Sequence, residues 1–437
     1  MKSRLLPRLI APSILFALAL ASTASGQWVE DSIDVGGAWV GSLAYNPLMD
    51  VVYGGCHVAG IFFVIDCATN SVLTRWNLPR PQSLVYDSID DRVYCTTGSS
   101  DYDTVYVIDG TTFQPVARIP VYWALEAVWD PDRNRVYVSS GEDNEIAVID
   151  CTTDSVIATV HVGRYPIKMS LNRQHGKLYV LNTDGESVSI VDLEALEETE
   201  EIRLDNVPEC GLYSEATGKF YCGGYPAVTA VDGVGDSVVA EVRLPDNGAA
   251  YALAENPEAG VVLVGVDGYP GDHICAVATG PDTLLSALSC PAGPQVIHWS
   301  ARSRQFYVGL RVGVVAVVNS DGSSVVAEVP VQDSPFCMAL SPQQHRLFVG
   351  HLNTRYVYVI RDEVGGVAES GSTRLPRGAA AVVRSTLKTD SPGLLLDVSG
   401  RAVMRLLRGE NDVRRLAPRV YAVTTARGVT RRVVKVR

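Results

Sequence analysis

The residue types with the greatest chemical potential in this 437-residue sequence are recurring aspartates, nine cysteines and seven histidines. Five aspartates each follow an apolar run: Asp66, Asp109, Asp150, Asp192 and Asp232. A ring of carboxylates would suit a divalent cation. Each of the five, however, precedes a polar turn, where an aspartate side chain accepts bonds from backbone N–H groups. We therefore interpret them as turn residues and predict no metal site from them.

The histidines and cysteines share no metal-ligand spacing. The histidines are His57, His161, His175, His273, His298, His345 and His351, and the cysteines include no C-x-x-C pair. No G-x-S-x-G, H-E-x-x-H or glycine-rich strand–helix motif occurs either. We therefore predict no metal, no cofactor and no catalytic residues, although enzyme activity stays open.

An odd number of cysteines leaves at least one thiol unpaired. The nine are Cys56, Cys67, Cys95, Cys151, Cys210, Cys222, Cys275, Cys290 and Cys337. Several of them recur at the same repeat position, which is typical of small core residues. The best disulfide candidate is Cys210–Cys222, because both residues flank one predicted hairpin.

Two sequence markers recur with a period of about 42 residues. The first is an apolar run ending at a turn residue, clear in 63–66 and 106–109 and weaker in the copies ending at Ala278, Asn319 and Arg361. The second is a large residue at spacings of 41 to 44: Tyr53, Tyr94, Tyr137, Tyr179, Tyr221, Leu263, Tyr307 and Phe348. Two independent markers thus define eight repeats.

Each repeat holds four short runs of high β-propensity. In one repeat they cover residues 166–171, 177–181, 187–192 and 201–204, with turn-forming residues between them. The second and third runs are nearly apolar throughout, which is typical of sheets covered on both faces. Four strands in ~40–45 residues are the period of a propeller blade. The predicted fold is all-β: a β-propeller of four-stranded blades over residues 28–363.

The repeat count predicts eight blades, with seven as the alternative if the weak unit at 250–290 is irregular. Residues 31–36 resemble the fourth run of other repeats, such as 158–163, yet they precede the first complete repeat. The last repeat reaches Ile360 without a fourth run. We therefore expect the N-terminal run to complete the last blade and close the ring.

Residues 135–138 (RVYV) with 146–150 (IAVID), and 178–182 (LYVLN) with 188–192 (VSIVD), carry a family resemblance. They are similar to the YVTN-type β-propeller repeat of surface-layer and YncE-like proteins. The resemblance covers about 340 residues and implies the fold, but it names no activity. The units around Leu263 and Tyr307 depart from the pattern, so their blades are expected to be less regular.

The first 26 residues have the composition of a secretory signal peptide. Three basic residues precede an apolar stretch at 10–21 and small residues at 24–26. The apolar stretch is shorter than the ~20 residues that a membrane-spanning helix needs, and no other stretch reaches that length. We expect an exported protein with no transmembrane segment in the mature chain.

Charge divides the chain into two parts. Residues 372–437 carry 15 Lys and Arg against 4 Asp and Glu, whereas the preceding 371 residues carry 22 against 45. After a linker at 364–377, we predict a small basic β-sandwich-like domain at 378–437, with strands at 393–398, 401–407, 419–423 and 430–437. The acidic ring excludes a nucleic-acid partner on charge. The basic tail has one aromatic residue, Tyr421, and no stacking platform.

Residues 396–401 (LDVSGR), 411–413 (NDV), 416–418 (LAP) and 433–436 (VVKV) give the tail a second resemblance. It is similar to the C-terminal sorting domain of type IX secretion cargo. That resemblance implies a secretion machinery as partner and an extracellular or outer cell-surface location. Arg419 replaces the glycine that the family usually has before Val-Tyr. A periplasmic location is the alternative if the domain is degenerate.

These features predict an exported, non-catalytic binding or structural scaffold for an unknown protein or glycan ligand. Ligands of propellers usually meet the loops between the fourth and the next first strand and between the second and third. Those loops hold the candidate binding residues Tyr122, Trp123, Arg164, Tyr165, Tyr225, Tyr269, His351 and Arg355. Aromatic side chains beside arginine are typical of binding hot spots.

The alternative function is a propeller hydrolase of the lactonase type, which is related to YVTN-like folds in architecture. It requires carboxylates that converge on a metal ion at the central channel. Glu126, Glu209 and Asp333 lie near predicted first strands, but they form no recognisable motif.

Overall fold

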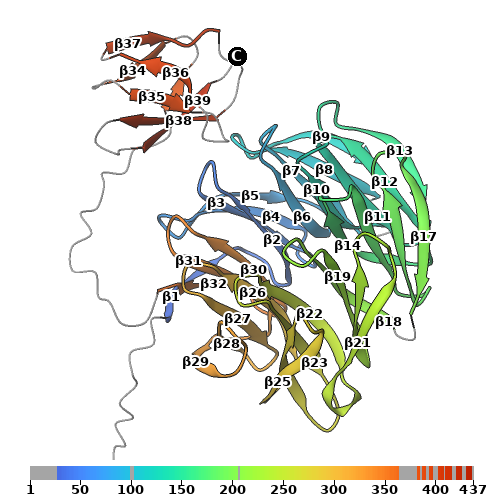
Figure 1. Ribbon diagram of the computed structural model, residues 1–437. Helices are drawn as coiled ribbons and strands as arrows, with labels where there is room; N and C mark the ends of the chain where they lie inside the picture. The colour runs from blue at the N-terminus through green and yellow to red at the C-terminus, as the bar shows by residue number, and fades with distance from the viewer. Residues whose placement is uncertain are drawn as a thin grey trace, which may run out of the picture.

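The computed structural model describes residues 27–98, 103–204 and 207–363, together with 381–383, 386–389, 393–396, 402–407, 409–415, 420–425 and 430–435. The predicted signal peptide at 1–26 and linker at 364–377 lie outside the described residues. The main body is a ring of eight four-stranded antiparallel sheets (Figure 1). The prediction of eight blades is confirmed, and the seven-blade alternative is wrong.

Blades I to VIII follow one another along the chain. Blades I to III comprise β2 (Val40–Asn46), β3 (Val51–Cys56), β4 (Ile61–Asp66) and β5 (Ser71–Asn77); β6 (Pro81–Asp87), β7 (Arg92–Thr97), β8 (Thr104–Asp109) and β9 (Pro115–Pro120); and β10 (Ala124–Asp130), β11 (Arg135–Ser140), β12 (Glu145–Asp150) and β13 (Ser155–His161). Blades IV and V comprise β14 (Pro166–Asn172), β15 (Lys177–Asn182), β16 (Ser187–Asp192) and β17 (Glu197–Arg203); and β18 (Val207–Ser214), β19 (Lys219–Tyr225), β20 (Ala227–Asp232) and β21 (Val238–Arg243). After the 3-10 turn η1 (Pro245–Asn247), blades VI to VIII comprise β22 (Ala249–Asn256), β23 (Val261–Asp267), β24 (Asp272–Ala278) and β25 (Thr283–Cys290); β26 (Pro294–Ser300), β27 (Gln305–Leu310), β28 (Val314–Asn319) and β29 (Val325–Pro330); and β30 (Pro335–Ser341), β31 (Arg346–His351) and β32 (Tyr356–Arg361) with β1 (Val29–Asp34).

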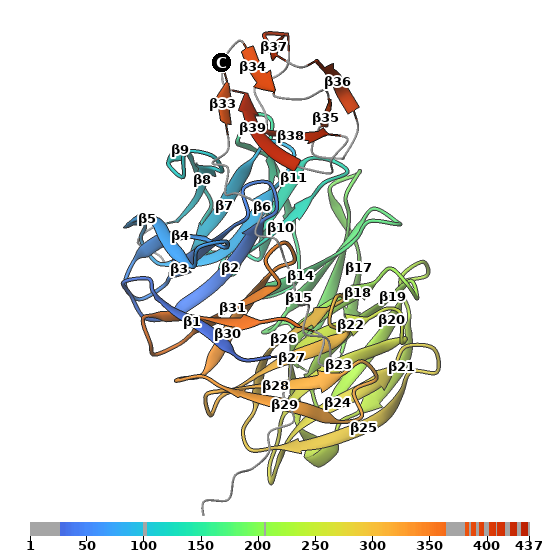
Figure 2. The ribbon, with the colours of Figure 1, turned by 90° about the vertical axis from the view of Figure 1, so that its left-hand side faces the viewer.

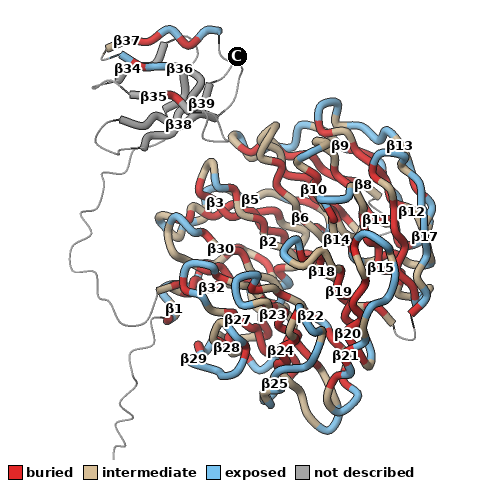
Figure 3. Tube along the Cα trace, in the orientation of Figure 1, coloured by how far each residue is buried: buried red, intermediate tan, exposed pale blue. Residues whose placement is uncertain are grey.

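The core lies between neighbouring blades. The first strands contact each other around the centre of the ring, and the second and third strands are almost fully buried (Figure 3). The eight large marker residues of the second strands, from Tyr53 to Phe348, are all 0% exposed. The near-continuous apolar runs therefore reflect sheets packed on both faces, as the sequence predicts. Leu263 fills the tyrosine position of blade VI without loss of the four-stranded sheet.

The N-terminal strand closes the ring, as predicted. β1 pairs antiparallel with β32, and Ile33 lies opposite Val357. The blue β1 lies beside the orange strands of blade VIII in both views (Figures 1 and 2). Glu30 forms ion pairs with Arg346 and Arg361, so β1 is also held by charge at its beginning. The first and last described parts of the ring are thus one sheet.

The fourth strand of blade IV begins earlier than its sequence predicts. We expect it at 201–204, but β17 covers Glu197–Arg203 and is exposed along nearly its whole length. Its glutamate-rich sequence has low β-propensity. As an outermost strand it needs only backbone pairing with β16, so solvated side chains are tolerated.

The recurring aspartates cap turns, as predicted. Asp109 accepts hydrogen bonds from the backbone N–H groups of Thr111 and Thr112, and Asp150 accepts them from Thr152 and Thr153. Asp192 likewise accepts bonds from two backbone N–H groups, whereas Asp66 and Asp232 each accept one, from Thr69 and Gly235. Their carboxylates are therefore satisfied locally within hairpins.

The Cys210–Cys222 disulfide is not formed, and all nine cysteines are free thiols. In the β18–β19 pairing, Cys210 lies opposite Gly223 and Cys222 lies opposite Gly211. The two side chains consequently enter different cores, Cys210 between blades V and VI and Cys222 between blades IV and V. Two cysteines on neighbouring strands of one hairpin can form a disulfide only if their side chains point to the same face of the sheet. A shift of one residue along a strand turns a side chain to the other face, so their position in the hairpin alone does not predict the bond.

The C-terminal part has more strands than its sequence predicts. The described strands are β33 (Ala381–Val383), β34 (Thr386–Thr389), β35 (Gly393–Leu396), β36 (Ala402–Leu406), β37 (Gly409–Asp412), β38 (Val420–Thr425) and β39 (Thr430–Lys435). They form a five-stranded sheet in the order β33-β39-β38-β35-β36 and a two-stranded sheet of β34 and β37. The short polar strands β34 and β37 carry no clear β-pattern, which explains why sequence reasoning missed them. Within the described ranges, no helix has the length and apolar character needed to cross a bilayer.

Candidate ligand-binding face

The candidate binding residues lie on one face of the ring, which we call the loop face. It consists of the loops that enter each first strand and those that join each second strand to the third. Trp123 and Tyr165 directly precede the first strands β10 and β14, and Tyr269 and Arg355 lie in second-to-third loops. The ring therefore presents these residues on a common side, but it spreads them over several blades.

A β-bulge lies near the beginning of every first strand. The register shifts just after the first paired residue in six blades, and one residue later, after Pro208 and Ala250, in blades V and VI. A bulge leaves a residue unpaired and re-aims its side chain. Tyr251 and Phe336 occupy this position and are 41% and 36% exposed. Both rings are therefore partly exposed on the innermost strands of their blades.

Four bulky residues stand directly before the first strands of blades I to IV: Trp39, Arg80, Trp123 and Tyr165. All four have positive φ, between 41° and 59°. This conformation is rare for large side chains and clusters at functional sites. Sequence reasoning missed Trp39 and Arg80, although their spacing from Trp123 and Tyr165 follows the 42-residue repeat and could have revealed them.

Loop side chains hold two of these backbones in place. The Asp103 carboxylate accepts a hydrogen bond from the Trp123 N–H at 3.1 Å, and the Asn144 side-chain oxygen accepts one from the Tyr165 N–H at 2.8 Å. Each acceptor comes from the preceding blade. Neighbouring blades therefore fix the aromatic residues rather than leaving them on free loops.

A second small cluster surrounds His57. Its ring lies 5.3 Å from that of Trp39, and Arg80 Nη2 is 3.4 Å from His57 Nε2. Burial lowers the pKa of His57, and the neighbouring Arg80 charge lowers it further. His57 therefore stays neutral at pH 7 and can accept the Arg80 hydrogen bond, which orients the guanidinium.

The structure places His351 in the interior and Arg355 in an ion pair. His351 is 0% exposed and packs edge-to-face on Tyr358, with neither ring nitrogen hydrogen-bonded. Arg355 is bonded to Asp34 at the end of β1 and helps to close the ring. Tyr225 and Tyr269 are 54% and 92% exposed, but no described aromatic ring contacts either.

The buried His351 makes folding stability depend on pH. Burial lowers its pKa to about 4, whereas the unfolded side chain protonates near 6.5. As pH falls from 6.5 to 4, the unfolded state binds more protons, so this residue costs about 3 kcal/mol of stability. Unfolding free energies at pH 7.5 and 4.5 should show this loss in the wild type and not in His351→Leu. Burial raises the pKa of Asp87 to about 6, so protonation of Asp87 makes the folded state more stable as pH falls. Because both proteins contain Asp87, its contribution cancels when their pH dependences are compared. Identical pH dependence of the two proteins would contradict the assignment.

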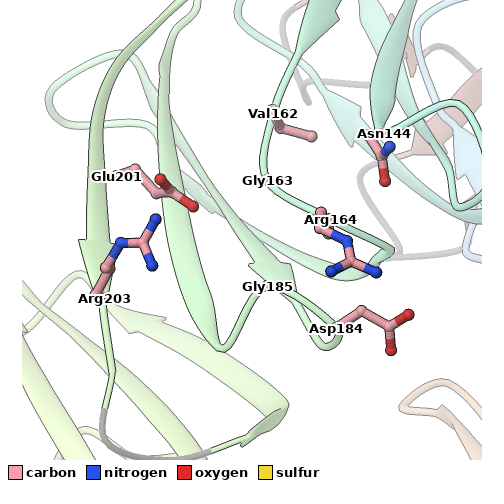
Figure 4. Close-up of a pocket in the computed structure, with 8 residues that line it drawn as sticks. All are labelled: Asn144, Val162, Gly163, Arg164, Asp184, Gly185, Glu201 and Arg203. Atoms are coloured by element: carbon pink, nitrogen blue, oxygen red, sulfur yellow. The ribbon is translucent and has the colours of Figure 1, made fainter.

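Arg164 lines a pocket of ≈ 390 Å³ on the loop face between blades III and IV (Figure 4). Its walls are Asn144, Val162, Gly163, Arg164, Asp184, Gly185, Glu201 and Arg203. Arg164 and Asp184 project from one side, and Glu201 and Arg203 project from β17 on the other (Figure 4). The pocket offers both signs of charge, from Arg164 and Arg203 and from Asp184 and Glu201, so it is suited to contacts with polar groups.

The three carboxylates of the hydrolase alternative do not form one site. Glu126 accepts hydrogen bonds from Lys168 Nζ at 3.0 Å and from the Met169 N–H, and Asp333 accepts one from the side chain of Asn353. Burial raises the pKa of Glu209. Within the described residues, no three His, Cys, Asp or Glu side chains lie close enough to hold a metal ion. The convergent ligands that the hydrolase alternative requires are thus not found among the described residues.

Comparison with known proteins gives partial matches. No protein-family model matches the chain. Two proteins named "Uncharacterized protein YncE", from Salmonella typhi and Salmonella typhimurium, are each 29% identical over 127 residues, which is 28% of this chain and 35% of each relative. The chain thus spans about a third of the length of the curated relatives that it matches.

Solved structures with the same fold cover more of the chain. The computationally designed Ika8 protein matches 75% of this chain and 98% of its own with a TM-score of 0.62 and 15% identity. A chain in the crystal structure of the Mitotic Checkpoint Complex matches 83% of this chain and 99% of its own with a TM-score of 0.55 and 14% identity. At such identities the likeness shows the fold alone. The chain is an eight-bladed β-propeller with sequence similarity to YncE.

Proposed function

We propose that this protein is an exported, non-catalytic β-propeller that displays a ligand-binding loop face outside the cell. The observation that carries the proposal is the set of bulky, partly exposed residues that the closed ring holds in strained loop conformations. A rigid scaffold with shaped loops is the usual arrangement of a binding protein. Metal analysis and a lactone hydrolysis assay test the non-catalytic role. Turnover that a point change in the ring abolishes would refute it.

Export is supported by the signal-like residues 1–26 and by the likeness of the tail to a type IX sorting domain. Cells that produce the full chain should carry it on the surface or release it into the medium. Cells that produce a chain without residues 378–437 should retain it in the periplasm, because the proposed sorting signal is missing. Both proteins keep the entire ring, so matched tryptophan fluorescence serves as the folding control. Surface exposure of the truncated chain would refute the sorting role.

A further inference from the structure

The bulky residues at the entrance to the channel occupy one half of the ring. The position directly before the bulge-bearing segment of each first strand carries Trp39, Arg80, Trp123 and Tyr165 in blades I to IV, and Val207, Ala249, Gly293 and Ser334 in blades V to VIII. One backbone hydrogen bond is shared by both halves. The carbonyl groups of Trp39, Trp123, Tyr165, Gly293 and Ser334 each accept a bond from the loop after the second strand of the same blade. Small residues make this bond without the positive φ of blades I to IV, so the bond does not require the large residues or their strained backbone.

The large residues before the first strands of blades I to IV also bury little of their apolar surface. Trp39 is 40% exposed, and Trp123 and Tyr165 are only partly buried. Their positive φ angles carry a cost on the order of 1–3 kcal/mol each. Partly exposed aromatic residues held in a strained conformation are typical of a surface that contacts another molecule.

Glycines leave space for these side chains to approach one another. A Cβ atom on Gly141 would lie 2.8 Å from Leu125 Cδ1, 3.1 Å from Trp123 Cδ1 and 3.4 Å from Tyr165 Cε2, so an atom of each aromatic ring lies beside this glycine. A Cβ atom on Gly98 would lie 3.5 Å from the Gln82 side chain. Gln82 is exposed at the bulge position of β6, directly after Arg80 and Pro81. The half-ring thus combines flat apolar surfaces with an amide and a guanidinium.

Charge selects among the ligands that this surface could accept. Arg80 repels a cation from the half-ring, while the ring as a whole has about twice as many acidic as basic residues and repels a polyanion. On the neighbouring first strands β14 and β10, the Lys168 charge is compensated by Glu126 at 3.0 Å. An uncharged molecule with apolar ring faces and many hydroxyl groups fits best. Its C–H faces can pack on the aromatic rings, and its hydroxyl groups can bond to Gln82 and Arg80.

We propose that the half-ring of Trp39, Arg80, Gln82, Trp123 and Tyr165 binds a neutral oligosaccharide at the entrance to the channel. This inference rests on the proposed binding function and specifies its ligand class. The aromatic residues supply stacking surfaces, and Gln82 and Arg80 select the hydroxyl pattern. The corresponding positions of blades V to VIII carry the smaller residues Val207, Ala249, Gly293 and Ser334, so the proposed stacking surfaces are confined to blades I to IV.

The test is a glycan array followed by calorimetric titration of the mature chain, residues 27–437, with neutral hexasaccharides of glucose, xylose and N-acetylglucosamine. At least one should bind, and Trp123→Ala should weaken its binding at least tenfold. Gly141→Ala keeps every aromatic residue but inserts a methyl group beside two rings, so it should weaken binding without removing a contact. Leu285→Ala, which removes a side chain that is 55% exposed on the outermost strand β25, is the matched control and should bind like the wild type.

The possible results distinguish failure of the saccharide site from failure of the proposed loop-face binding function. Failure of every neutral saccharide to bind, or full binding by both Trp123→Ala and Gly141→Ala, would overturn the saccharide site. Binding of only charged glycans or of a protein would also overturn it. In the protein case, loss of binding in Tyr225→Ala or Tyr269→Ala would leave the proposed loop-face function standing.

Discussion

Loss of Ile33 from β1 should destabilise the whole ring rather than one strand. Ile33 is 5% exposed and packs in the core cluster that contains Val357 and Val359. Truncation to Ile33→Ala removes buried apolar volume and should lower the free energy of unfolding by about 3 kcal/mol. Deletion of residues 27–35 should have a larger effect, because blade VIII then keeps three strands and exposes the edge of β32.

Urea unfolding followed by tryptophan fluorescence measures this effect on the ring alone, since all six tryptophans lie between residues 28 and 299. Ser32→Ala is the control, because Ser32 lies on the same strand but is exposed. Its effect should stay within about 0.5 kcal/mol. The surface ion pairs of Glu30 and Asp34 should contribute less than the core contact, because solvent screens them. Wild-type stability of both Ile33→Ala and the deletion would contradict closure by β1.

Asp362→Ala should also be among the most damaging single changes. Asp362 is 1% exposed and follows β32. Its carboxylate accepts hydrogen bonds from Tyr307 Oη at 2.5 Å and from Ser300 Oγ at 2.6 Å, both in blade VII. Removal of the carboxylate leaves two buried hydroxyl groups without their acceptor, which should cost about 3 kcal/mol or more. The bond links consecutive blades, so the loss should lower the stability of the ring as a whole.

The same urea titration measures this change, with two comparison variants. Tyr307→Phe keeps the packed ring and removes one donor, so it should cost about 1.5–2 kcal/mol. Asp321→Ala removes an exposed turn carboxylate and should cost less than about 1 kcal/mol. A cost below 1 kcal/mol for Asp362→Ala would show that the carboxylate does not hold the two blades together. Tyr94 with Asp154 and Tyr221 with Asp282 repeat this contact between other blades.

The fold could be predicted because the same strand pattern recurs in eight repeats of the sequence. The blade that contains Leu263 departs from the pattern, but the regular spacing of the repeats on either side still predicts its position in the chain. Single side chains lack this redundancy. The register of β18 and β19 decides that Cys210 and Cys222 face different cores, and the position of His351 at the end of β31 decides that it is buried. Neither depends on residue type or spacing.

The candidate site was predictable only in part, for a related reason. Trp123 and Tyr165 stand out as aromatic loop residues, whereas Arg80 does so only when it is aligned with them by the repeat period. Positive φ at all four positions is a property of the backbone that these residue types ordinarily oppose. A local conflict between residue type and conformation is therefore informative about function only after the structure is known.

Oxidative footprinting of the mature chain, with and without the best-binding neutral hexasaccharide, tests the central claim most directly. Hydroxyl radicals modify exposed aromatic side chains, and mass spectrometry reads each site. The half-ring site predicts that saturating saccharide protects Trp39, Trp123 and Tyr165 and leaves Tyr225 and Tyr269 as reactive as before. Protection of Tyr225 and Tyr269 with no change at Trp39 and Trp123 would contradict a binding site at the entrance to the channel on blades I to IV.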